Sequence, residues 1–115
     1  VRAMSWHTTC SSILRKLIKT KGSRLFTTPV DWIKDNLATY QTTILHPMDL
    51  GTIDRRLNAE VGGYTNPDDF VSDVRMVFCN ALLFNGLYNQ VTQTAEVFSL
   101  LFEQELASHG PTYMN

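Results

Sequence analysis

The chain has 115 residues and a mass of 13.1 kDa, which is the size of one folded domain. Its residues are 43% hydrophobic and only 18% charged, a balance that excludes a disordered chain and suffices for one hydrophobic core. The longest apolar runs, at 81–84 and 100–102, fall far short of the roughly 18 residues of a membrane span, so no membrane partner is expected. We expect residues 1–115 to form a single domain with its core between about residues 6 and 108.

The charges are distributed unevenly along the chain. Ten basic residues stand against eleven acidic ones, a formal net charge of −1, yet six of the ten lie within the first 24 residues, where no acid occurs. The remainder therefore carries four cations against eleven acids, a balance that suits a cationic partner better than nucleic acid. The basic first segment is explained most simply as the solvated face of a helix.

The two cysteines, Cys10 and Cys79, share no metal-binding motif. Neither a Cys-x-x-Cys pair nor a Cys/His ligand spacing occurs, so we expect no metal and no cofactor. A free cysteine in a helical segment is usually buried. The presence of free cysteines without a disulfide pattern indicates a reducing compartment.

The three histidines, His7, His46 and His109, have no nucleophile or carboxylate at a recognisable catalytic spacing. A glycine-rich phosphate loop is also missing from the sequence. We therefore predict that the protein is not an enzyme.

Three long segments without glycine or proline, 1–21, 68–85 and 87–109, show the periodicity of amphipathic helices. In each segment the apolar residues recur at steps of three and four, which places them on one face. These faces are formed by Trp6, Cys10, Ile13 and Leu17 in the first segment, by Phe70, Val74, Val77 and Ala81 in the second, and by Val91, Ala95, Phe98, Phe102 and Leu106 in the third.

Local signals mark the beginnings of two helices. Asn66 is a suitable cap for the second long helix, and Pro67 fits its first turn because proline lacks the N–H that a helix start leaves unpaired. A shorter helix is expected at about 50–60, with Asp49 as its cap. No run has a partner strand or a hairpin turn, so the predicted fold class is all-α, a bundle of four helices.

The connection between the first helix and the short helix, residues 22–49, is unusually long. Connections of that length inside a compact domain are uncommon and are usually functional. This one is rich in apolar residues, so it has to pack back onto the bundle, where it can form the wall of a pocket. A short helix at about 31–36 fits within it.

The second long helix ends at Asn85, directly before Gly86. A spacing of four from Ala81 places the asparagine on the core face of that helix. Two explanations stay open at this point. An asparagine before a glycine is a common end of a helix, whereas an amide at the mouth of the bundle can exchange hydrogen bonds with a buried ligand.

Three segments carry a recognisable pattern, namely PVDW at 29–32, ILHPMDLGTIDRRL at 44–57 after Tyr40, and DFVSDVRMVFCNALLFN at 69–85. Together they resemble the bromodomain family, whose members read acetylated lysine. The resemblance implies a left-handed four-helix bundle with a long loop between its first and second helices. It also implies a nuclear module that binds acetylated lysine peptides, in particular histone tails, in chromatin and transcription regulation. The acidic remainder of the chain is expected to help hold a basic tail, a contribution that salt weakens.

The resemblance also assigns roles to single positions. Asn85 matches the asparagine whose amide donates to the acetyl carbonyl, and Tyr40 matches the tyrosine that reaches the same carbonyl through a water. Three matches are structural, with Asn80 as the tether of the long loop, and Pro47 and Asp49 at the start of the short helix. The other positions that match the acetyl-lysine pocket are apolar, and they are Leu25, Phe26, Val30, Leu37, Phe84 and Val91.

The chain departs from the family pattern at the shelf beside the pocket. The Trp-Pro-Phe of the family reads Arg24-Leu25-Phe26 here, and Trp32 either covers part of the lost aromatic area or belongs to the core. The change leaves an alternative function open, a bromodomain-like scaffold for protein interactions with weak or lost acetyl-lysine binding. In both cases we expect a monomer that does not bind nucleic acid directly.

Overall fold

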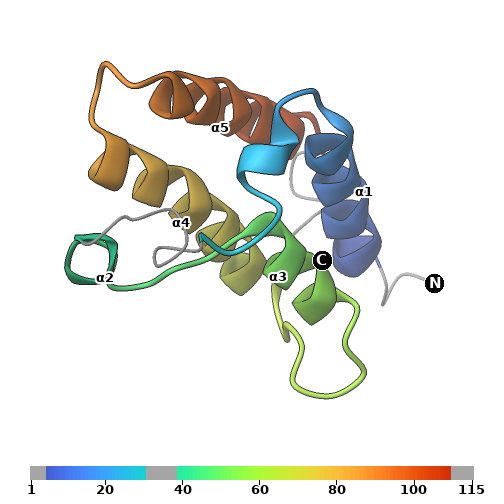
Figure 1. Cartoon of the computed structure of the whole chain (residues 1–115). Helices are drawn as coiled ribbons and strands as arrows, with labels where there is room; N and C mark the ends of the chain where they lie inside the picture. The colour runs from blue at the N-terminus through green and yellow to red at the C-terminus, as the bar shows by residue number, and fades with distance from the viewer. Residues whose placement is uncertain (1–4, 31–38, 110–115) are drawn as a thin grey trace.

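The computed structural model describes residues 5–30 and 39–109, and Figure 1 shows their arrangement. Every regular element in these ranges is helical, which confirms the all-α class. None of these helices combines the length and the apolar content that crossing a bilayer requires. The short helix expected at about 31–36 lies outside the described residues, as do Trp32 and Leu37. The bundle is formed by α1 (Ser5–Lys19), α3 (Leu50–Leu57), α4 (Pro67–Asn85) and α5 (Gln90–His109).

Helix α1 packs one apolar stripe against α3, α4 and α5. The stripe consists of fully buried side chains, namely Cys10, Ile13, Leu14 and Leu17. The helix ends at Lys19, two residues before the predicted end, because the chain then turns at Gly22. The φ of Gly22 is 97°, in the left-handed region that favours glycine, and the one-turn 3-10 helix η2 (Ser23–Leu25) follows it.

The caps of α3 and α4 lie where the sequence predicts them. An Asp49 carboxylate oxygen accepts a hydrogen bond from Thr52 N at 2.8 Å, and Asn66 Oδ1 accepts one from Asp69 N at 2.9 Å. Each bond satisfies an N–H group that the first turn of a helix leaves without a partner. Helix α3 ends at Leu57, a little before the predicted end at about 60.

Helix α5 begins at Gln90, three residues later than the periodicity alone predicts. Gly86 ends α4 with a φ of 79°, and Asn89 Oδ1 accepts the N–H of Val91 at 2.7 Å. This cap starts the helix, so residues 87–89 belong to the turn between α4 and α5. The buried face of α5 packs on α4 and α1, and it consists of Thr92, Ala95, Phe98, Phe102 and Leu106.

The long loop contains a regular element that the sequence analysis does not predict, the one-turn helix α2 (Tyr40–Thr43). Two hydrogen bonds fix the flanks of the loop to the bundle. Leu50 N donates to the Phe26 carbonyl at 2.6 Å, and Asn80 Nδ2 donates to the His46 carbonyl at 2.8 Å. Because α3 and α4 supply these donors, the described flanks of the loop lie against these two helices, as Figure 1 shows.

Gly51, in the first turn of α3, lies where the loop approaches that helix most closely. A Cβ atom at this position would clash with the carbonyl oxygen of Thr27. In a helix without such a contact, alanine is about 1 kcal/mol more favourable than glycine. Whether a change of Gly51 to alanine raises or lowers the stability of the domain therefore tests the contact.

We predict that Gly51→Ala lowers the free energy of unfolding by about 1–3 kcal/mol, because the loop has to move away from the added methyl group. Urea denaturation measures this change. Gln104→Ala, on the exposed face of α5, serves as the control and should stay within about 0.5 kcal/mol of the parent protein. A Gly51→Ala protein that is more stable than the parent would contradict the close approach of loop and helix.

Candidate functional site

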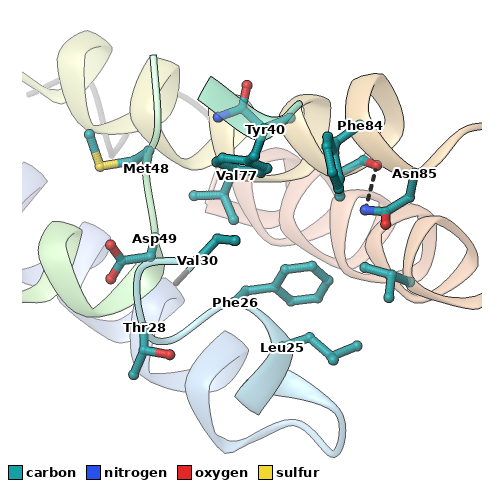
Figure 2. Close-up of a pocket in the computed structure, with 13 residues that line it drawn as sticks. Leu25, Phe26, Thr28, Val30, Tyr40, Met48, Asp49, Val77, Phe84 and Asn85 are labelled. Carbon is teal, nitrogen blue, oxygen red and sulfur yellow. Dashed lines mark hydrogen bonds between the residues drawn. The ribbon is translucent and has the colours of Figure 1, made fainter. Parts of the chain in front are cut away.

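A cavity of about 260 Å³ opens between the long loop and the C-terminal half of α4 (Figure 2). Most of its wall is apolar. Its lining residues come from η2, the long loop, α2, α4 and α5, and they are Leu25, Phe26, Thr28, Val30, Tyr40, Met48, Asp49, Val77, Asn80, Ala81, Phe84, Asn85 and Val91.

Asn85 brings a primary amide to this cavity from the last residue of α4. Its Nδ2 donates to the carbonyl of Ala81, one turn earlier, at 3.0 Å, and Figure 2 marks this bond. The same carbonyl lies 3.4 Å from the hydroxyl of Thr92, which is fully buried on α5. An amide nitrogen carries two hydrogens, so Asn85 keeps one N–H and its own carbonyl for a ligand while its helix fixes its orientation.

Tyr40, the first residue of α2, brings a hydroxyl to the same cavity. Its ring packs edge-on against Phe84, with 4.9 Å between the ring centroids. Burial raises the pKa of the Tyr40 phenol above its ordinary value, which already lies far above neutral pH. Tyr40 therefore keeps a protonated hydroxyl and lines the same cavity as Asn85.

The first residues of the long loop form the opposite wall. Phe26 is deeply buried, and its ring lies 5.3 Å from that of Phe78 and 5.4 Å from that of Phe98. It is thus a core residue whose edge also faces the cavity. Leu25 and Val30, on either side of it in the chain, also line the cavity and are partly exposed to solvent.

Two buried polar residues hold the backbone behind this wall. Asn80 donates to the His46 carbonyl from α4, and Asp49 accepts both the backbone N–H and the hydroxyl of Thr52, the latter at 2.7 Å. Pro47 lies exposed between these two anchors. Asn80 and Asp49 thus fix the end of the loop to α4 and to α3, and both also line the cavity.

The cavity contains seven of the eight positions that the sequence assigns to the pocket, and the eighth, Leu37, lies outside the described residues. It also contains residues that the sequence analysis does not assign to it. Val77 and Ala81 precede Asn85 by eight and four residues, so helical spacing alone places them on the same face. Thr28 has no such signal, because its position depends on the path of the loop.

Few acidic side chains line the cavity within the described residues. Asp49 is the only carboxylate among the lining residues, and Thr52 occupies both of its oxygens. The acidic residues of α4, which are Asp68, Asp69 and Asp73, lie in the N-terminal half of the helix, away from Asn85. The described residues also contain no group of three or more His, Cys, Asp or Glu side chains placed to hold a metal ion.

Comparison with known proteins gives an independent assignment. The family model of the bromodomain matches residues 10–97. Transcription factor GTE11 of Arabidopsis thaliana is 43% identical over 94 residues, and the SWR1 complex bromodomain subunit bdf1 of Schizosaccharomyces pombe is 38% identical over 97 residues. Transcription factor GTE3, chloroplastic, of Arabidopsis thaliana is 41% identical over 96 residues.

The matched parts cover 82%, 84% and 84% of this chain, in the same order, but only 15%, 16% and 20% of the relatives. The chain therefore spans a fifth or less of the length of these curated relatives. The family match covers well over half of the chain and includes the loop and the helix that build the cavity. The chain belongs to the bromodomain family.

Proposed function

We propose that this domain binds peptides that carry acetylated lysine, and that Asn85 is its main polar contact with the acetyl group. The observation that carries the proposal is an oriented primary amide in an otherwise largely apolar cavity of about 260 Å³. A neutral amide with a small apolar tip is the group that such a site accommodates. The family of the chain, whose members read acetylated lysine, supports the same assignment.

The apolar wall explains why the acetylated form is preferred. Burying an unpaired ammonium group costs several kcal/mol because its hydration is lost, whereas acetylation leaves a neutral amide and a methyl group. The methyl group and the lysine stem fit against Phe26, Val30 and Val91. The hydrogen bond from Asn85 adds about 1 kcal/mol net, so the exclusion of the charged form contributes more to selectivity than the bond does.

These terms are small, so the affinity for one acetylated lysine is weak. One direct hydrogen bond and the burial of one thin side chain correspond to a Kd on the order of 10–1000 μM. Tyr40 adds a contact to the same acetyl carbonyl through an ordered water, a role supported by its position in the lining of the same cavity as Asn85.

The names of the relatives indicate where such a domain works. They are two transcription factors, one of them with a chloroplast label, and a bromodomain subunit of the SWR1 complex. We propose acetylated histone tails in the nucleus as the ligands, and binding without catalysis by a monomeric domain that makes no direct contact with nucleic acid. Incubation with an acetylated peptide followed by mass spectrometry should return the peptide unchanged, and loss of the acetyl group would contradict this part.

We predict that Asn85→Ala reduces binding of acetylated histone peptides at least tenfold, because the remaining cavity has no amide for the acetyl carbonyl. Titration calorimetry measures the affinity, and circular dichroism with urea denaturation shows whether the variant folds. Asn58→Ala is the control, because it removes a side-chain amide of the same kind at the C-terminal end of α3. This variant should leave the affinity unchanged. Equal binding by Asn85→Ala and the parent would remove Asn85 from the site.

The unmodified peptides form a second arm of the same titration. The parent protein should bind some acetylated peptides and none of their unmodified forms. Binding that is indifferent to acetylation would support the scaffold function instead.

We predict that Tyr40→Phe weakens the same binding about fivefold, because the packing on Phe84 stays while one hydrogen bond through water is lost. Tyr64→Phe is the matched control, since the Tyr64 hydroxyl donates to Asp73 at 2.6 Å and does not line the cavity. That variant should lose stability and keep its affinity. Equal affinities of Tyr40→Phe and the parent would exclude the hydroxyl from recognition.

A further inference from the structure

Two partly exposed apolar residues extend the wall of the cavity onto the surface. Leu25 and Val30 both line the cavity, yet they expose 49% and 40% of their surfaces. They therefore do not fill the core of the domain. A peptide whose side chain enters the cavity has to pass over this rim, so its neighbouring residues come within reach of Leu25 and Val30.

The turn between α4 and α5 displays two further apolar side chains next to the site. Leu87 exposes 64% of its surface and Tyr88 exposes 95%. Both ends of the turn are fixed, since Gly86 N donates to the carbonyl of Leu82 and Asn89 caps α5. The turn thus holds Leu87 and Tyr88 in solvent directly after Asn85, which lines the cavity. Exposed apolar side chains grouped around a pocket are typical of a binding surface.

Few charged side chains lie close to the cavity in the described part of the chain: Asp49 lines it with both oxygens bound by Thr52, and Glu96 follows Val91 by five residues on α5. Residues 76–95, which span the end of α4, the turn and the start of α5, contain no charged side chain, and neither do residues 25–30. Asp73 lies twelve residues before Asn85, roughly 18 Å along the helix at 1.5 Å per residue, well beyond the screening length of about 8 Å at physiological salt.

The acidic residues in the second half of α5 are already occupied by cations of this domain. Glu103 pairs with Arg75 at 2.8 Å, and Glu105 pairs with Lys16 at 3.0 Å. Their carboxylates are therefore engaged within the domain rather than directed at a peptide that lies across the cavity.

We infer that the preferred ligand carries an apolar side chain next to its acetylated lysine, and that the apolar rim binds this side chain. The apolar rim is formed by Leu25, Val30, Leu87 and Tyr88. The inference rests on the proposed function, since the peptide reaches the rim because its acetyl-lysine occupies the cavity. Leu25 and Val30 belong to the lining of the cavity, and Leu87 and Tyr88 follow Asn85 closely in the chain. None of the four is charged, which matches an apolar neighbour better than a basic one.

Titration calorimetry with short peptides tests the inference. All peptides carry one central acetyl-lysine, and leucine, lysine or glutamate replaces serine at one flanking position at a time. At the best position, leucine should improve the affinity over serine about fivefold to tenfold, as expected for partial burial of one apolar side chain. The improvement should be the same in 50 mM and 300 mM NaCl, because no charge contributes to it.

Two variants connect the preference to the rim. In Tyr88→Ser combined with Leu87→Ser, the ratio of the leucine to the serine affinity should fall below about twofold. Val61→Ser is the matched control, because Val61 is 90% exposed in the connection between α3 and α4 and does not line the cavity. That variant should keep the full ratio.

The outcomes separate this inference from the proposed function. If all peptides bind with the same affinity, the apolar preference is wrong and acetyl-lysine binding stands. A preference for the lysine peptide also overturns the inference. A preference for the glutamate peptide, through the basic residues that precede Leu25 in the chain, overturns it as well. If no acetylated peptide binds, including the serine peptide, the proposed function itself falls and the inference falls with it.

Discussion

The site depends on two hydrogen bonds that hold the backbone of the long loop against the helical bundle. The N–H of Leu50 binds the carbonyl of Phe26, and the amide of Asn80 binds the carbonyl of His46. Between these anchors the described part of the loop contains one regular element, the one-turn helix α2. The bonds therefore convert an apolar connection into a wall that faces the end of α4. Without them, Asn85 would lie at an open helix terminus instead of beside a cavity.

The loop and α4 contribute different parts of the cavity. The loop and α4 both supply apolar surface, and α4 also supplies the amide that we propose as the contact with the ligand. Since Asn85 is oriented by the Ala81 carbonyl of its own helix, its direction does not depend on the loop. A small number of polar groups in an apolar recess selects for a neutral ligand. Each polar group can exchange a hydrogen bond with a neutral ligand, whereas a charged ligand would lose its hydration without gaining an ion pair. The recess is thus suited to a modified lysine and unsuited to the unmodified one.

Much of the fold follows from the sequence by simple rules. Apolar spacing of three and four identifies the three long helices, and the cap at Asn66 marks the beginning of α4 to the residue. The periodicity misplaces the beginning of α5, because Leu87 and Tyr88 continue the apolar pattern although Asn89 caps the helix. The one-turn helix α2 has too few residues to produce any periodic signal.

The residues of the site are harder to predict from the sequence by such rules than the helices are. Asn85, Ala81 and Val77 share one helix face, so their proximity is visible in the spacing. The approach of Phe26 and Tyr40 to that face depends on hydrogen bonds to backbone carbonyls, which every residue has and which leave no trace in the sequence. Only the resemblance to the bromodomain family indicated these residues. The exposure of the apolar rim, formed by Leu25, Val30, Leu87 and Tyr88, is likewise visible only once burial is known.

A crystal structure of this domain with an acetyl-lysine peptide tests the central claim most directly. The account predicts that the acetyl carbonyl accepts a hydrogen bond of about 2.9 Å from Asn85 Nδ2. It further predicts that the methyl group lies in the cavity between the long loop and α4. An acetyl-lysine bound elsewhere on the domain, or a cavity closed by its own side chains in the complex, would contradict it.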